Sequence, residues 1–148
     1  MQITSRFTVA IHLLTYLDLY LGRERISSER LAGSIGVNPV IVRSVIGELR
    51  AAGIVTSQRG SGGARLARPL SEITFYDVYR AVQSVDEKGL FHFHEQPNPA
   101  CPVGRGIHAV LDGRLREVQE AMEARLKSIT LSEVAADMRA RIEGEAGS

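Results

Sequence analysis

The sequence predicts a mainly α-helical fold with one small β-hairpin and a long helix near its C-terminal end. Residues 26–53 contain two short helical patterns joined by a tight turn, as in a helix-turn-helix. Residues 54–57 and 64–67 favour short strands, and the glycine-rich run between them can reverse the chain. Residues 102–128 repeat apolar side chains at helical spacing. We therefore predict a winged helix-turn-helix followed by a long dimerisation helix.

The first predicted helix begins at Thr4 or Ser5, either of which can cap it. Its apolar run covers only about 15 residues and contains a histidine and an aspartate, so it fits neither a membrane span nor a signal peptide. We expect a cytoplasmic protein with no membrane partner. The main apolar stripe of this helix comprises Phe7, Ala10, Leu14, Leu17 and Leu21.

The helix-turn-helix is marked by residues that start and stop helices. Ser27 and Ser28 can cap the first helix, and Gly36 can adopt the positive φ that ends it. Asn38 caps the second helix, and Pro39 suits its first position. The buried stripe of the second helix is predicted to be Val42, Val45, Ile46 and Leu49.

The opposite face of the second helix is exposed and partly basic, and the hairpin tip carries an arginine among glycines. Such a helix can enter a DNA major groove while the tip approaches a phosphate or the minor groove. Two helices with this geometry also occur in proteins where they only pack against each other. The pattern alone therefore does not show that the chain binds DNA. The predicted DNA-binding residues are Arg6, Ser28, Asn38, Pro39, Val40, Ile41, Arg43, Ser44, Arg59, Ser61 and Gly62.

The charge distribution favours double-stranded DNA as the partner. Residues 1–70 hold nine arginines and four acidic residues, a net charge of +5. Residues 71–148 hold nine basic and thirteen acidic residues, a net charge of −4, so the total of +1 conceals the difference. A basic half-molecule around the predicted reading helix indicates that it binds a polyanion.

Besides the long helix, the second half of the chain is predicted to hold a short helix and a loop before it and a last short helix after it. Thr74 can cap a helix over 75–82, residues 84–104 lack a sustained period, and a last short helix spans 130–141. We place a DNA-binding domain at 1–84, and the loop and dimerisation helices at 85–148, in one compact unit.

The long helix over 102–128 would extend about 40 Å, which is more than the DNA-binding domain at 1–84 can cover. Its uncovered stripe therefore needs a partner, and a second copy of the chain is the simplest one. A homodimer would also present two reading helices to two half-sites. The predicted interface residues are Val103, Ile107, Leu111, Leu115, Val118 and Met122.

The chain resembles the Rrf2 family of bacterial transcription regulators. The resemblance rests on TSRFTVAIHLLTYL, NPVIVRSVIGELRAAGIVTSQRG, GG, LARP and ITFYDVYRAV, which follow in order over nearly the whole chain. The wing tip is one residue shorter than the usual RGxxGGYxLAR, and Ala64 stands where an aromatic residue is common. The resemblance implies a DNA-binding regulator, expected to be a repressor that binds a palindromic operator as a homodimer.

The loop before the long helix gathers groups that can sense a signal: Cys101, His92 and His94. Cys101 precedes Pro102 and so is expected at the N-cap of the long helix, where unpaired N–H groups stabilise a thiolate. A thiolate of this kind is what redox sensing requires, although a small capping residue would fit the same position. A single cysteine cannot form a disulfide within the chain.

Members similar to this chain carry an iron–sulfur cluster on three cysteines in this loop, two of which are missing here, so we expect no cofactor and no metal site. Zinc or copper held by Cys101 with histidines stays an alternative, as does a small-ligand-responsive regulator. A less favoured alternative is an enzyme with Cys101 as nucleophile and His92, His94 or His108 as base.

Overall fold

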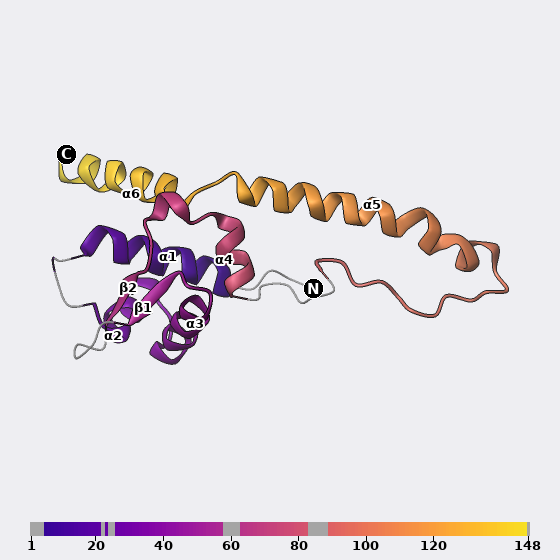
Figure 1. Cartoon of the computed structure of the whole chain (residues 1–148), viewed down its shortest axis with the longest axis horizontal. Helices are drawn as coiled ribbons and strands as arrows, with labels where there is room; N and C mark the ends of the chain where they lie inside the picture. Colours follow the sequence, from indigo (N-terminus) through magenta and orange to yellow (C-terminus); the bar gives the residue numbers. More distant parts are fainter. Residues whose placement is uncertain (1–4, 22, 24–25, 58–62, 83–88, 148) are drawn as a thin grey trace.

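The structure is a computed structural model that describes residues 5–21, 23, 26–57, 63–82 and 89–147. Its elements in chain order are α1 (Ser5–Tyr20), α2 (Ser28–Ile35), α3 (Pro39–Ala51), β1 (Val55–Ser57), β2 (Ala64–Leu66), the 3-10 turn η1 (Leu70–Glu72), α4 (Phe75–Ala81), α5 (Pro102–Lys127) and α6 (Leu131–Ala146). Figure 1 shows a head built from α1 to α4 and the hairpin, an arm formed by α5, and α6 lying alongside α1. The predicted winged helix-turn-helix with a long C-terminal helix is confirmed.

The caps that define α2 and α3 are those expected from the sequence. Ser27 Oγ accepts the backbone N–H of Arg30 at 3.1 Å, and Gly36 ends α2 with φ of 82°. Asn38 Oδ1 accepts the N–H of Val40 at 2.8 Å, and Pro39 occupies the first helical position. These local features determine where α2 begins and ends and where α3 begins.

The core of the head lies between α1, α3 and α6. The α3 stripe is fully or almost fully buried as predicted, and α6 adds Leu131 and Ala135 to the same cluster. Leu21 departs from its predicted place in the α1 stripe, because α1 ends at Tyr20 and the Leu21 side chain is 51% exposed. The predicted domain boundary at 84 falls among residues outside the described ranges.

The hairpin pairs Val55 with Leu66, Thr56 with Arg65 and Ser57 with Ala64 in antiparallel register. It was predicted to begin at Ile54, whose carbonyl accepts the N–H of Ala67 at 2.9 Å just beyond the ladder. Arg59, Ser61 and Gly62, predicted at its tip, lie outside the described part of the chain.

The end of the arm is hydrogen-bonded to the start of α4. Thr74 and Asp77 form a capping box at α4, and Thr74 pairs with Thr130 in an isolated bridge. The Phe75 N–H donates to the carbonyl of Ile129 at 2.9 Å, and the Leu131 N–H donates to the carbonyl of Ile73 at 2.8 Å. The junction between α5 and α6 is therefore held on the head.

The last helix is longer than predicted, since it continues to Ala146 and not only to Arg141. The glycine at 144 disfavours a helix by about 1 kcal/mol, but the neighbouring glutamates and alanine favour it. Arg141 also pairs with Glu145 one turn later, at 3.8 Å between Nε and Oε1. The predicted end of this helix at 141 is therefore wrong by five residues.

Candidate nucleic-acid interface and sensor loop

The outer surface of α3 begins with two exposed apolar side chains. Val40 is 64% exposed and Ile41 is 38% exposed, although α3 buries its other large aliphatic residues. Arg43 and Ser44 follow on the exposed surface one turn later. The structure therefore brings together four of the predicted DNA-binding residues, while Asn38 and Pro39 serve to start the helix.

Arg43 is paired with a residue that the sequence analysis did not connect to it. Its Nη1 donates to Glu29 Oε1 of α2 at 3.2 Å, and both side chains are more than half exposed. An exposed pair of this kind contributes only about 0 to 1 kcal/mol, so a phosphate or base can replace the carboxylate readily. Only the placement of α2 against α3 reveals this pair.

Arg6 differs from the expectation that it is free to reach a phosphate. Its Nη2 donates to Ser44 Oγ at 2.8 Å and also forms an ion pair with the Glu48 carboxylate. The start of α1 lies against α3, so the guanidinium joins the two helices. In this structure Arg6 positions Ser44, whereas Ser28 is a half-buried first residue of α2.

The described part of the wing carries an exposed arginine that the predicted site omits. Arg65 lies on β2 opposite Thr56 and is exposed. Its alternation with half-buried Ala64 and Leu66 is the sequence signal that could have identified it as an outward residue.

The loop over 89–101 runs back along α5 and is attached to it at both ends (Figure 1). At one end the Leu90 N–H donates to Gln119 Oε1 at 2.8 Å. At the other end Arg105 Nη1 donates to the carbonyl of Pro99 at 3.0 Å. Gly104 lets the loop approach, because a Cβ there would lie 2.4 Å from the carbonyl oxygen of Asn98.

Cys101 stands at the N-cap of α5 and is exposed, as the sequence predicts. The backbone amides of Gly104 and then Val103 lower the pKa of the Cys101 thiol, against a small opposing effect of burial. The side chain does not complete a capping hydrogen bond of standard geometry, so the amides act on the sulfur mainly through their dipoles.

A second group of titratable side chains lies further along the loop. His108 Nδ1 is 3.0 Å from Asp112 Oδ1, and the rings of His94 and His108 lie 4.9 Å apart between centroids. The hydrogen bond to Asp112 raises the pKa of His108. Burial lowers this pKa, while the charge of Asp112 and a hydrogen bond with the backbone of His94 raise it further. The spacing of His108 and Asp112, four residues apart on a helix, is a sequence signal that the prediction missed.

These residues surround an open hollow of about 360 Å³ between the loop and α5. It is lined by Phe91, His92, Phe93, His94, Glu95, His108 and Asp112. The structure thus groups His94 with His108 and Asp112, whereas the neighbours that act on Cys101 are the first amides of α5. Within the described ranges, no three histidine, cysteine or acidic side chains gather in a way that could hold a metal ion.

The predicted dimer residues divide between two sides of α5. Not one residue of α5, all of which are described, is buried. Val103, Val110 and Val118 are 70%, 59% and 54% exposed. Ile107, Leu111, Leu115 and Met122 are half-buried, and Leu115 lines a hollow with Phe91 and Phe93 of the loop. Val110, an apolar residue of the predicted helix over 102–128, was not among the predicted interface residues.

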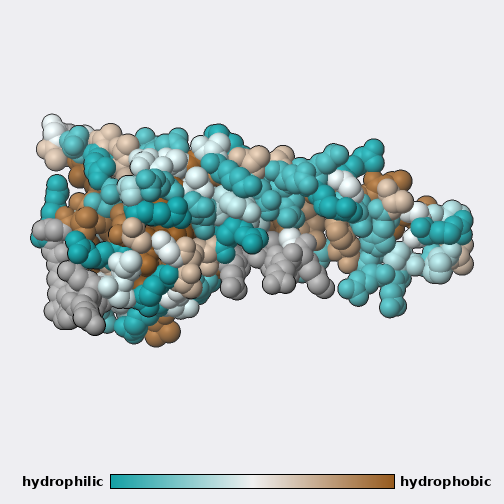
Figure 2. Space-filling model, in the orientation of Figure 1, coloured by the Kyte–Doolittle hydropathy of each residue, from teal (hydrophilic) through white to brown (hydrophobic). Residues whose placement is uncertain are grey.

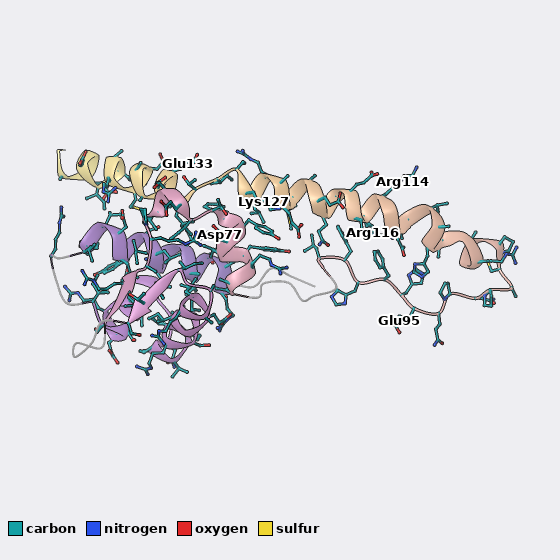
Figure 3. The ribbon with its side chains drawn as sticks, in the orientation of Figure 1. Asp77, Glu95, Arg114, Arg116, Lys127 and Glu133 are labelled. Carbon is teal, nitrogen blue, oxygen red and sulfur yellow. The ribbon has the colours of Figure 1, made fainter. Side chains whose placement is uncertain are left out.

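Figure 3 shows how the charged side chains of the arm are arranged. Glu95 points from the loop away from α5, and Arg114 lies on the side of α5 opposite the loop. Lys127, at the end of α5, lies with Nζ 4.5 Å from the centroid of the Tyr76 ring on α4. Among the described helices, none is both long and apolar enough to cross a membrane.

Comparison with known proteins identifies the family. The family model described as "Rrf2: Iron-dependent Transcriptional regulator" matches residues 3–137. YwnA of Bacillus subtilis (strain 168), provisionally named an HTH-type transcriptional regulator, is 46% identical over 133 residues, covering 90% of this chain and 96% of YwnA.

Solved structures show the same fold. A crystal structure described, again provisionally, as a DNA-binding protein has a TM-score of 0.69 and 41% identity, covering 88% of this chain and 98% of that one. CymR (YrzC) of B. subtilis has a TM-score of 0.65 at 21% identity, covering 92% and 97%, and so shares the fold. The exposed helix α3 and its wing are thus part of a transcription regulator, and the chain belongs to the Rrf2 family.

Proposed function

We propose that the chain is a homodimeric repressor that reads a palindromic operator with α3 in the major groove. The observation that supports DNA docking is the exposed face of α3, where Arg43 lies beside apolar residues in a half-molecule of net charge +5. Arg43 can exchange Glu29 for a base edge or phosphate at small energetic cost. Such a repressor acts in the cytoplasm, where the bacterial chromosome lies.

The homodimer is supported by the arm. At about 1.5 Å per residue α5 is roughly 39 Å long, and its valines at 103, 110 and 118 face solvent on the side left open by the loop. Pairing with the same surface of a second copy would cover them. Two heads related by a twofold axis would read two inverted half-sites about one helical turn apart, hence a palindrome.

We propose Cys101 as the sensor of a thiol-reactive signal, with His92 and His94 further back in the same loop as accessory sensor residues. The thiol is exposed, its pKa is lowered, and it stands where the loop meets the dimerisation helix. The thiolate would attack one oxygen of hydrogen peroxide, which breaks the O–O bond, gives a sulfenic acid and expels hydroxide. A small thiol would then attack the sulfenic sulfur and release water to give a mixed disulfide. Added bulk at this end of α5 would change the spacing of the two heads.

Iron is named in the family's description, but the donor set of this loop does not fit it. The loop provides one cysteine, at the N-terminal end of α5, while the His94 ring lies tilted against the ring of His108 further along the helix. Within the described residues no three histidine, cysteine or acidic side chains are placed so that they could hold a metal ion, and an iron–sulfur cluster usually needs four ligands. The proposal therefore contains no step that depends on iron.

The test begins with an operator selection on the purified protein, followed by salt-dependent binding of variants. Arg43→Ala should relax base preference, whereas Arg59→Ala should weaken binding to all sequences and lower the salt slope by about one unit. Arg114→Ala, an exposed arginine on the far side of α5, is the matched control. If Arg43→Ala and Arg59→Ala both bind like the parent, the docking proposal is wrong.

The sensor is tested on the same operator with and without peroxide. The parent protein should lose affinity after thiol modification, and Cys101→Ser should bind DNA but ignore the oxidant. A parent protein that binds equally well before and after complete modification would make Cys101 a capping residue only.

A further inference from the structure

The recognition helix exposes apolar surface that the fold does not require. Among the described residues 26–57 and 63–82, Val40 and Ile41 are the only large hydrophobic side chains that are exposed. In Figure 2 apolar atoms lie at the lower edge of the head, where Figure 1 places α3. Exposed aliphatic groups on an otherwise polar face point to a contact with another molecule.

The backbone fixes where these two side chains can point. Pro39 is the first residue of α3, so Val40 and Ile41 are the second and third, within its first turn. Val42 follows at 0% exposure and anchors the buried stripe, which prevents the turn from rotating its valine and isoleucine inward. In a helix-turn-helix, the N-terminal residues of the second helix are those that meet base edges.

Neither side chain has a donor or an acceptor, so neither can read the hydrogen-bonding groups of a base. The one apolar group that a base pair presents in the major groove is the C5-methyl of thymine. We propose that Val40 and Ile41 recognise thymine methyl groups at adjacent positions of each operator half-site. This inference rests on the proposed function, because it assumes that α3 enters the groove.

Charge favours DNA over a second apolar protein surface at this face. Arg43 and Arg50 are exposed on the same helix, and Arg65 is exposed on the wing. A protein partner that covered the two aliphatic groups would have to place these arginines at its rim, whereas a duplex offers phosphates on both sides of the groove that holds the methyl groups.

The experiment measures affinity for a selected operator in which thymines are replaced by deoxyuridine, which lacks only the methyl group. The parent protein should bind the substituted half-sites about fourfold more weakly for each contacted methyl. Val40→Ala and Ile41→Ala should each lose most of the discrimination at one position. Both side chains are exposed, so circular dichroism melting should show that the variants fold like the parent.

Two controls make the readout specific. Leu21→Ala removes a similar exposed aliphatic group at the end of α1 and should keep full methyl discrimination. Deoxyuridine outside the half-sites should leave affinity unchanged.

Three results would overturn the inference in distinguishable ways. If the parent binds its operator specifically but treats thymine and deoxyuridine alike, methyl recognition is wrong while the proposed function stands. Discrimination that persists in both alanine variants would assign the methyl groups to other residues. If the parent shows no specific binding to any DNA, the proposed function fails and this inference fails with it.

Discussion

The head and the arm have the same kind of apolar helical spacing in the sequence but opposite environments in the structure. In the head, the stripe of α3 and the centre of α1 are covered by the chain itself, with Leu13 and Leu49 at 0% exposure. In the arm, α5 buries none of its residues. The spacing of apolar residues in the sequence shows which side chains share one face of a helix. Whether that face is covered depends on which later segments of the chain fold against it. Here α6 returns to the head, and the arm is covered on one side only, by the loop over 89–101.

The largest expected effect comes from a substitution in the part of the core that α6 contributes to the head. Leu131→Ala removes a side chain of 0% exposure from the core and should lower the free energy of unfolding by about 2 to 5 kcal/mol. Chemical denaturation at fixed protein concentration measures this. Leu21→Ala, at an exposed position, should change stability by less than about 0.5 kcal/mol. Equal losses in the two variants would contradict the place of Leu131 in the core of the head.

A charge on the arm should affect assembly but not the fold of the head. Val118→Glu places an ion on the surface that we propose to be buried between subunits, and should weaken dimerisation roughly a hundredfold or more. Light scattering over a concentration series measures this. Ala140→Glu adds the same charge to exposed α6 and should leave the dimer intact. A dimer that survives Val118→Glu would place the interface elsewhere.

The rate at which Cys101 reacts should show whether the dipole at the start of α5 acts on its thiol. Because the pKa of the thiol is lowered in the folded protein, more thiolate is present at pH 7 than in the unfolded chain. A maleimide should therefore react faster with the native protein than with the same protein in guanidinium chloride, once the reagent's own solvent dependence is corrected. Identical pH–rate profiles would show that the helix start does not act on the sulfur.

The smallest expected effect concerns the histidine pair on the arm. Asp112→Asn should lower the pKa of His108, whose raised value comes first from its hydrogen bond to Asp112. A raised folded-state pKa means that the pair stabilises the fold below the unfolded pKa of histidine, and that this contribution is lost as pH rises through the folded pKa. NMR titration of the imidazole measures the shift, and Asp137→Asn on exposed α6 is the control. An unchanged pKa in Asp112→Asn would contradict the observed geometry.

The parts of the fold that local chemistry determines could be predicted from the sequence. Asn38 and Pro39 start α3 as expected, and α5 was predicted over 102–128 and spans Pro102–Lys127. Caps and periods depend on residues a few positions apart, so a single sequence contains them. The length of α6 was wrong because helix formers around one glycine outweighed it.

The pairings between helices could not be predicted in this way. Arg6 pairs with Glu48, 42 residues away, and Arg43 with Glu29 of the preceding helix. Each basic residue has several acidic candidates in the sequence, and only the packing of α1, α2 and α3 selects between them. The predicted DNA-binding residues, Arg6 among them, stay a prediction until the operator experiments are done; in this structure the Arg6 guanidinium is bonded to Ser44.

The attachment of α6 has a consequence for the order in which the chain can fold during synthesis. Leu131 and Ala135 complete the core formed with α1, yet they are translated only after the whole of α5. Contacts between such distant residues form late, because the intervening chain must first be made and its ends brought together. A nascent chain that ends before residue 131 would have an open core beneath α1. The core that holds α3 is therefore completed only after α5 has been synthesised. A head with a complete core always comes with its arm.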